Sequence, residues 1–430
     1  MLAVSRAKRA KRVGARPGAG TRHHPDEDAG LPPEGRAAAE AGQGLRMLAR
    51  ERPLPASQPK GELPTMNVGV PKERRPFEYR VGLPPAGAAL FVKHGHTLYI
   101  ERGAGEGAGF SDDHYVREGA KIVYSKDEVY GRADLLLKFA RPLKDELDLM
   151  RPGLTLAGFL HLAAARQDKI WMMLEKTFTV LAYEQIEYDD GYRPVLAPLS
   201  QIGGLMVPQI ASRLLQNDQG GRGILLGRVV GVPPAEIVII GAGVVGTTAA
   251  AAFSAAGAHV TVLDVDLRRL HQLQADSGAQ VATMLSTPYN VSKLCTYADV
   301  IVGAVLAPGS RAPIVLTREM VASMKPRSVI IDMSIDEGGC VETSRPTTYA
   351  SPTYIEEGVI HFCVPNMSGV LGRTGTTALF NGAYPYLEAI ARLGVEAAID
   401  TIPALQRGVN ALRGEVVNLK RLGGIGGVKE

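Results

Sequence analysis

The 430-residue chain has few of the residues that mark disulfide-rich folds or metal centres. It contains three cysteines (Cys295, Cys340 and Cys363) and one tryptophan, and no two cysteines have CxxC spacing. Three cysteines exclude a disulfide scaffold, and the missing CxxC pair leaves no indication of a zinc site. We therefore expect no bound metal and a reducing, cytoplasmic compartment.

Long apolar runs and a basic body are also missing. No uninterrupted apolar stretch approaches 18 residues, which is the length that indicates a membrane-spanning helix. Residues 1–65 hold 12 Lys and Arg against 7 Asp and Glu, whereas the remaining residues hold 36 against 37. Because the basic excess is confined to the first segment, the body offers no electrostatic case for nucleic-acid binding. We expect neither nucleic acid nor membrane as a partner.

Residues 1–65 are rich in Arg, Ala, Gly and Pro and almost lack β-branched and aromatic residues. Such a segment cannot bury enough apolar surface to offset its ordering entropy. It is predicted to be a disordered extension, or a stretch upstream of the natural start at Met66. A transit peptide is the alternative, although serine is scarce and no secretory apolar core follows. Nucleic-acid or membrane-surface binding by residues 6–22 is a further alternative.

From Met66, short apolar runs alternate with amphipathic stretches. The first series of runs predicts strands at Asn67–Val70, Thr97–Glu101, Asp134–Phe139, Thr155–Phe159 and Val180–Tyr183, with helical patterns such as Pro84–His94 and Asp112–Glu118 between them. The second series predicts strands at Glu236–Ile240, His259–Leu263, Asp299–Val305, Ser328–Met333 and Val359–Val364. After residue 366 the pattern turns helical, with Ala378–Leu393 the longest candidate. The alternation predicts an α/β fold with two largely parallel sheets. The uniformly apolar second series predicts strands covered on both faces.

A glycine-rich turn follows the first strand of the second series. Gly241, Gly243 and Gly246 form GxGxxG between a predicted strand and a helix. This arrangement allows a tight turn, a close approach of backbone to pyrophosphate and close helix–strand packing. Asp264 ends the next strand, where a carboxylate binds ribose hydroxyls and repels a 2′-phosphate, so NAD is favoured over NADP. A βαβ unit without nucleotide is the alternative.

Four polar residues follow predicted strands or turns, where open parallel sheets bind ligands. Arg80 could bind a carboxylate or lie on the surface, and His161 could act as an acid/base or be a core histidine. Asp336, before a Gly pair, could be a general acid/base or a solvated loop residue. Asn366 could bond a nicotinamide or substrate oxygen, or cap a helix.

Together these residues resemble the alanine dehydrogenase family, which is related to the nucleotide-binding first domain of proton-translocating transhydrogenase. The resemblance covers about Met66 to Arg392. Its motifs include Val70-Pro-Lys-Glu, Glu78-Tyr-Arg-Val, Phe159-Leu-His-Leu-Ala-Ala, Gly220-Gly-Arg-Gly, Ile335-Asp-Glu-Gly-Gly-Cys and Val364-Pro-Asn-Met.

The resemblance implies reversible, NAD-dependent oxidation of L-alanine to pyruvate and ammonia, usually by a homohexamer. It implies two Rossmann-like domains, with the NAD domain inserted into a discontinuous substrate domain. On this chain the substrate domain is expected at residues 66–200 and 367–430, and the NAD domain at residues 201–366.

The resemblance also assigns roles to individual residues. Arg80 would bind the substrate carboxylate; Arg141, where the family usually has glutamate, is our own further candidate for substrate binding. His161 would bond the pyruvate oxygen and transfer protons, and Asp336 would act as acid/base in the carbinolamine step. The expected cofactor-binding residues are Ser200, Gly241, Gly243, Val244, Val245, Gly246, Asp264, Arg269, Val305, Leu306 and Asn366.

One departure from the family concerns the substrate site. The family usually reads Lys-Val-Lys-Glu-Pro after the third strand, and its second lysine binds substrate, whereas this chain reads Lys138-Phe-Ala-Arg-Pro. Ala140 therefore occupies the substrate-lysine position. Arg141 is one position further, so on a continuing strand it would point to the opposite face.

Three hypotheses follow for the function. The chain could oxidise alanine or a close relative, or it could act on a larger 2-oxo acid for which Ala140 leaves room. It could also be a non-catalytic NAD(H)-binding module. Retention of both His161 and Asp336 argues against the last, because binding alone needs no acid/base pair.

Overall fold

The computed structural model describes residues 65–162, 165–278, 280–306 and 311–419. The predicted extension therefore lies outside the described residues, apart from Thr65. No helix in the described ranges is long and apolar enough to cross a bilayer. Within the same ranges, no three His, Cys, Asp or Glu side chains are grouped so that they could hold a metal ion.

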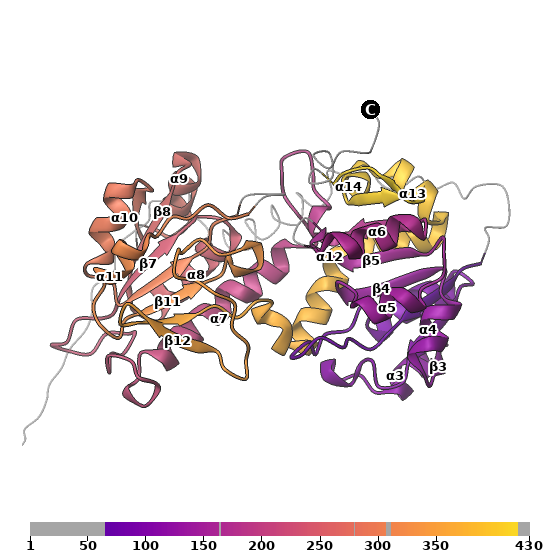
Figure 1. The fold of residues 1–430 in the computed structure, drawn as a ribbon, viewed down its shortest axis with the longest axis horizontal. Helices are drawn as coiled ribbons and strands as arrows, with labels where there is room; N and C mark the ends of the chain where they lie inside the picture. The colour runs from indigo at the N-terminus through magenta and orange to yellow at the C-terminus, as the bar shows by residue number, and fades with distance from the viewer. Residues whose placement is uncertain (1–64, 163–164, 279, 307–310, 420–430) are drawn as a thin grey trace, which may run out of the picture. The chain divides into compact units, whose positions relative to one another are not determined.

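The first sheet has eight strands, in the order β15-β14-β6-β5-β4-β1-β2-β3. Strands β1 to β6 are parallel to one another, while β14 and β15 are added antiparallel at one edge. The yellow C-terminal strands therefore lie beside strands from the first half of the chain (Figure 1). The strands are β1 (Asn67–Val70), β2 (Thr97–Glu101), β3 (Lys121–Val123), β4 (Leu135–Ala140), β5 (Thr155–Phe159), β6 (Thr179–Ala182), β14 (Val409–Leu412) and β15 (Glu415–Val416).

Helices α4, α5 and α6 pack on this sheet and form one apolar core with it. Leu136, Leu156 and Val180 enter the core from the strands, and Tyr130 and Leu147 from the helices. The elements that connect the strands are α2 (Pro85–Lys93), η1 (Glu106–Ala108), α3 (Asp112–Arg117), α4 (Lys126–Arg132), α5 (Lys144–Leu149), α6 (Gln167–Glu175), η3 (Tyr183–Gln185), α12 (Gly372–Leu393), α13 (Val395–Thr401) and α14 (Pro403–Arg407).

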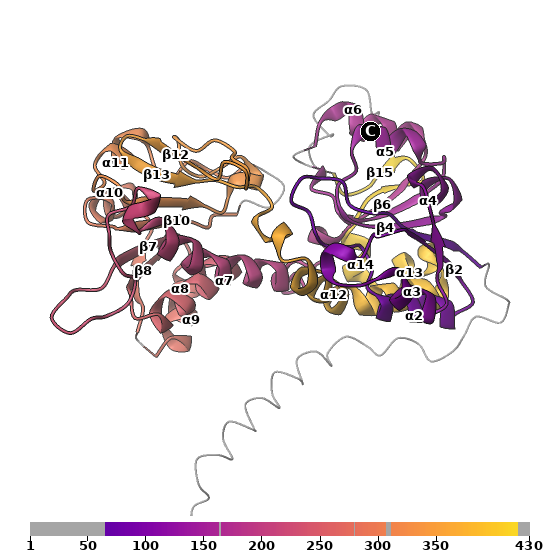
Figure 2. The same ribbon diagram turned by 90° about the horizontal axis from the view of Figure 1, so that it is seen from below.

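The second sheet has seven strands, in the order β12-β13-β11-β10-β7-β8-β9. All its pairs are parallel except β12 with β13. Its strands are β7 (Glu236–Ile240), β8 (His259–Asp264), β9 (Ala282–Leu285), β10 (Val300–Gly303), β11 (Val329–Asp332), β12 (Thr353–Glu356) and β13 (Val359–Phe362). Its helical elements are α7 (Ala197–Leu214), η4 (Asn217–Gln219), α8 (Val244–Ala255), α9 (Leu267–Asp276), α10 (Pro288–Cys295), α11 (Arg318–Ala322), η5 (Ile335–Glu337) and η6 (Met367–Val370). Figure 2 shows α7 beside α8, and α12 also contacts α7.

The parallel strands of both sheets follow the doubly wound order 3-2-1-4-5-6. In such a sheet the order in which strands are added reverses between the first and fourth strands, which stay parallel. Ligands bind at the carboxyl ends of that pair. These switch points lie between β1 and β4 in the first sheet and between β7 and β10 in the second. The whole second sheet is inserted between β6 and β14 of the first, as the discontinuous two-domain fold requires.

The predicted strands are confirmed, with exact bounds at β1, β2, β5 and β7. All residues of β10, β11 and β13 are buried, as their apolar sequences predict. Two expectations need correction. The segment after residue 366 is not wholly helical, because β14 and β15 follow its helices. The second correction is helix α7, which the sequence did not predict. Gly203, Gly204 and Pro208 within α7 lower its helix propensity, and burial against α8 overrides this.

Candidate active site

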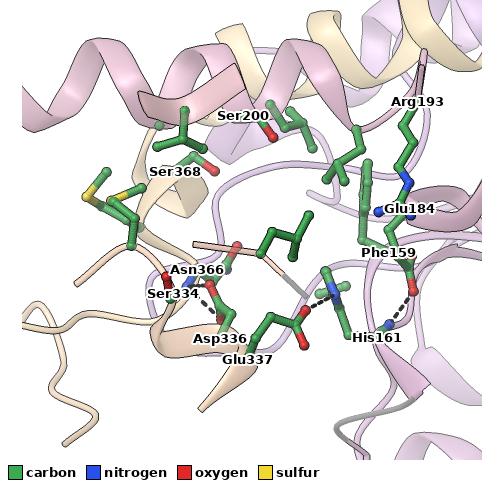
Figure 3. A pocket seen from close by; sticks show the side chains of 18 of the residues that line it. Phe159, His161, Glu184, Arg193, Ser200, Ser334, Asp336, Glu337, Asn366 and Ser368 are labelled. Atoms are coloured by element: carbon green, nitrogen blue, oxygen red, sulfur yellow. Dashed lines mark hydrogen bonds and ion pairs between the residues drawn. The ribbon is translucent and has the colours of Figure 1, made fainter. Parts of the chain in front are cut away.

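A cavity of about 580 Å³ is lined by residues that follow strands of both sheets. Figure 3 shows that side chains following strands of the first sheet and of the second sheet point into this cavity. The predicted site residues that line it are Arg80, Arg141, His161, Ser200, Val245, Val305, Leu306, Asp336 and Asn366. The other predicted residues belong to the glycine-rich turn and to β8 and α9, and are not among the lining residues: Gly241, Gly243, Val244, Gly246, Asp264 and Arg269.

His161 follows β5 and has a positive φ of 43°. Its backbone N–H donates to Glu184 Oε1 at 2.6 Å, and its Nδ1 lies 3.6 Å from Glu337 Oε1 (Figure 3). Burial opposes protonation of the imidazole, but the negative charges of Glu184, Glu337 and Asp336 outweigh it and raise the pKa of His161 to about 9. The side chain lines the cavity and is partly exposed, so it is not a core histidine.

Asp336 lies in the short helix η5 directly after β11. Its carboxylate oxygens accept the backbone N–H of Asn366 at 3.0 and 3.2 Å. Burial raises the pKa of Asp336, while this hydrogen bond and the charges of His161 and Arg80 act in the opposite direction. A carboxyl group with a raised pKa beside a protonated imidazole is suited to exchanging protons with a ligand.

Arg80 is only 3% exposed, so the surface alternative is wrong. Its Nε and Nη2 donate to the two oxygens of Glu78 at 2.6 and 2.5 Å, and Nη1 donates to Ser368 Oγ at 2.9 Å. Nη2 also donates to Asn366 Oδ1, and Phe139 lies under the guanidinium at 3.7 Å. Glu78 therefore occupies the bidentate edge of Arg80, which leaves little of it for a ligand.

Asn366 connects Arg80 with the second sheet. It directly precedes η6 and has a φ of 54°, a conformation that asparagine tolerates well. Its side chain makes no cap hydrogen bond; Nδ2 donates to Glu78 Oε2 at 2.8 Å. The helix-cap alternative is therefore wrong for this side chain.

Arg141 does not point away from the cavity, as a continuing strand would require. The β4–β5 register shifts between Leu137 and Ala140, and β4 ends at Ala140, so strand alternation stops there. Both Ala140 and Arg141 line the cavity. Arg141 Nη1 donates to the His161 carbonyl oxygen at 2.8 Å.

The glycine-rich turn joins β7 to α8 at the second switch point. A Cβ on Gly241 would lie 2.3 Å from the Ala304 carbonyl oxygen, and one on Gly246 would lie 1.8 Å from that of Gly241. A Cβ on Gly243, by contrast, would meet no atom within 4 Å. Two glycines are thus required by packing, while the third leaves open space in front of the helix N-terminus. This space fits a pyrophosphate.

Asp264, at the end of β8, is fixed beside this turn. Its Oδ2 accepts the Ala242 N–H at 2.6 Å and its Oδ1 accepts the Asp266 N–H at 2.8 Å. Arg269 Nη1 lies 3.8 Å from Oδ2. The carboxylate keeps lone pairs for further donors, which is the property that ribose recognition needs.

Sequence reasoning missed several residues of the cavity. Glu184 and Glu337 surround His161, Ser368 binds Arg80, and Arg75 lines the wall near Arg141. Glu184 follows β6 and Arg75 follows β1, so the rule that ligands bind at strand ends could have found both. Glu337 had no signal except its place beside Asp336.

The doubly wound sheets, the glycine-rich turn and the acid/base residues of one cavity define a dehydrogenase-like α/β protein of two sheets. The chain belongs to the alanine dehydrogenase/PNT family. Residues 69–203 match the description "Alanine dehydrogenase/PNT, N-terminal domain", and residues 207–419 match "Alanine dehydrogenase/PNT, C-terminal domain".

Individual relatives are similar over most of their length. Alanine dehydrogenase from Methanococcus maripaludis is 45% identical over 352 residues, covering 82% of this chain and 94% of the relative. The enzyme from Mycolicibacterium smegmatis is 41% identical, covering 82% and 95%. A solved L-alanine dehydrogenase superposes with a TM-score of 0.78 at 41% identity, covering 83% and 98%. A transhydrogenase from Sinorhizobium meliloti, 24% identical, shares the fold with a TM-score of 0.70 and covers 82% of this chain and all of its own.

Proposed function

We propose that the chain is an NAD-dependent L-alanine dehydrogenase that interconverts L-alanine with pyruvate and ammonia. Relatives named for this activity are 40–45% identical to it over most of their length. The observation that carries the proposal is the meeting of His161, from the first sheet, with Asp336, from the second, at one cavity.

The chain's own residues suit NAD at the second switch point. Gly243 leaves the open space for the diphosphate, Asp264 is available to the ribose, and Val245, Val305 and Leu306 line the adjoining wall. Ser200 and Asn366 line the same cavity and complete the proposed set. When bound there, NAD accepts the hydride from C2 of the amino acid.

His161 and Asp336 would donate and accept the protons that the reaction transfers. With a pKa near 9, the imidazole of His161 is protonated at neutral pH and can donate to the C2 oxygen of pyruvate. The raised pKa of Asp336 lets this carboxyl hold a proton, or release it, at the hydroxyl and amine of the carbinolamine.

Carboxylate recognition would be shared between two arginines. Arg80 has its bidentate edge on Glu78, so we infer that it contributes one remaining N–H at Nη1. Arg141 is the nearest candidate to replace the missing family lysine, because it follows Ala140 directly and lines the cavity.

The direct test is oxidation of NADH, followed at 340 nm, by the full chain with pyruvate and ammonium. We expect saturable turnover. His161→Ala should reduce kcat/KM by about 100- to 10,000-fold, because it removes the acid, while NADH binding stays nearly intact. His271→Ala, on an exposed part of α9, is the matched control and should keep wild-type rates. A His161→Ala variant with wild-type rates would contradict the assigned role.

We further propose the domain division at residues 66–200 with 367–430 and at residues 201–366. Sheet membership supports it, since β14 and β15 join the first sheet and β7 to β13 form the second. A cytoplasmic homohexamer is our proposal from the family resemblance, and analytical ultracentrifugation tests the oligomer.

A further inference from the structure

The first sheet has a switch point of its own, between β1 and β4, and it also faces the cavity. The loop after β1 carries Arg75, and the end of β4 carries Ala140 and Arg141. All three residues line the cavity. A ligand is expected at this place on topology alone, and it would lie between two guanidinium groups.

These two arginines differ from the other arginines of the cavity wall. Arg80 pairs with Glu78, Arg193 with Glu187, and Arg407 with Asp189. Across the described ranges, no carboxylate lies within 4.0 Å of a side-chain nitrogen of Arg75 or Arg141. Their bonds to protein go to backbone carbonyls: Arg75 Nε donates to the Arg141 carbonyl at 3.1 Å, and Arg141 Nη1 to that of His161.

The acids closest to Arg141 are already engaged. Glu184 accepts two backbone N–H groups, Glu337 pairs with His161, and Asp336 accepts from Asn366. They attract Arg141 over longer distances without pairing with it. Burial and the charge of Arg75 lower the pKa of Arg141, and the charges of these acids act in the opposite direction.

A third cation increases the positive charge at this switch point. Lys169, on α6, donates to the Pro142 carbonyl at 3.2 Å. Burial lowers the pKa of Lys169, and repulsion by the charges of Arg75 and Arg141 lowers it further. An anionic ligand group would relieve this repulsion.

Pyruvate has only one carboxylate. The cations at this switch point, together with Arg80, could bind more than one. We propose that Arg75 binds a second carboxylate, with Arg141 donating to both carboxylates, so that the enzyme takes 2-oxo dicarboxylic acids of four or five carbons and the matching acidic amino acids. Ala140 supplies the room for the longer side chain. The inference rests on the proposed function, since it names the substrate class of that same site.

The reaction is the same reductive amination. The C=O bond at C2 breaks and a C–N bond to ammonia forms. NADH supplies the hydride and its two electrons to C2, and the oxygen leaves as water with protons from ammonium and solvent. The second carboxylate does not react, and it only binds.

The kinetic test compares oxaloacetate and 2-oxoglutarate with pyruvate, each with NADH and ammonium. We expect at least one dicarboxylate to be turned over with a kcat/KM comparable to that of pyruvate. Arg75→Gln should lower kcat/KM for that dicarboxylate about ten- to hundredfold, mainly through KM, and change that for pyruvate by less than about threefold. Arg75→Lys should restore part of the loss. Arg413→Gln, at an exposed ion pair, is the matched control.

Binding to the NADH complex gives a readout without turnover. Succinate and glutarate should bind more tightly than propionate to the wild type, by calorimetry, and lose this advantage in Arg75→Gln. Equal affinities, or equal losses for pyruvate and dicarboxylates, overturn the inference. Turnover of pyruvate without any dicarboxylate leaves the proposed function intact and refutes only the inference. Tight succinate binding without any turnover refutes the proposed function and the substrate class, and it supports only the binding of a second carboxylate at Arg75.

Discussion

At the scale of single residues, the cavity combines backbone strain with charge. His161 has a left-handed φ, which costs a residue other than glycine on the order of 1–3 kcal/mol. Two hydrogen bonds hold the segment in place, from the Leu160 and His161 N–H groups to Glu184. The imidazole lies beside Glu337, and the charge of Glu184, which accepts these two hydrogen bonds, makes the largest contribution to raising its pKa.

Glu337→Gln tests this charge directly. The pKa of His161 is raised to about 9, so the imidazolium persists up to that pH, and wild-type kcat/KM for pyruvate should fall as pH rises through 9. Removing one negative neighbour lowers the pKa toward the ordinary value of about 6.5. The fall should therefore begin at lower pH in Glu337→Gln. A pH–rate profile checks this, with exposed Glu415→Gln as control. Superimposable profiles would refute the pairing.

At the scale of elements, β4 depends on a buried ion cluster. Lys138 is fully buried, with Nζ 3.1 Å from Glu73 Oε2 and 3.1 Å from Glu146 Oε1. Glu73 Oε1 also accepts the Phe139 N–H at 2.7 Å, and Glu146 accepts Tyr130 Oη at 2.6 Å. Burial raises the pKa of Glu73. The cluster fixes the end of β4, and with it the Phe139 ring under Arg80.

Lys138→Met should be strongly destabilising. It leaves two carboxylates buried without their cation, which costs about 3–5 kcal/mol in the free energy of unfolding. Lys144→Met removes an exposed partner of Asp148 and should cost less than about 0.5 kcal/mol. Urea denaturation of both variants measures the difference. Similar midpoints would show that the cluster contributes no net stability.

At the scale of the whole molecule, both switch points contribute residues to one cavity, so cofactor binding should stabilise the chain. NADH at 100 times its Kd should add about 2.7 kcal/mol and raise Tm, and NADPH should add less because Asp264 repels the 2′-phosphate. Gly243→Val should fold normally but lose this shift, since a Cβ at this position meets no protein atom within 4 Å and the side chain would occupy the space proposed for the diphosphate. Gly246→Ala should lower Tm without ligand. Differential scanning fluorimetry compares them, and an unchanged NADH shift in Gly243→Val would place the diphosphate elsewhere.

Sequence alone predicted most of the fold. Apolar runs revealed the central strands, because strands that are buried on both faces consist mainly of apolar residues. Strands β9 and β12 were missed because they are short and partly exposed. Helix α7 was missed because its glycines and proline conceal a helix that tertiary packing stabilises.

The site was predicted less completely. Strand ends and motifs pointed to His161, Asp336 and Asn366, all of which line the cavity. The pairing of Glu78 with Arg80 could not be predicted, because it depends on where a side chain two residues away folds back. The direction of Arg141 depends on a register shift between two strands, for which a single sequence carries no signal.

The pair Ala140 and Arg141 also constrains how such a site can change during evolution. Since neither Arg75 nor Arg141 pairs with a carboxylate in the described part of the chain, a lysine introduced at position 140 would add a further positive charge at the same wall. Arg141→Glu would first supply a carboxylate that accepts the lysine. The two positions are therefore epistatic: a change to the family's Lys-Glu pair is favourable when the glutamate is introduced first and unfavourable when the lysine is introduced first.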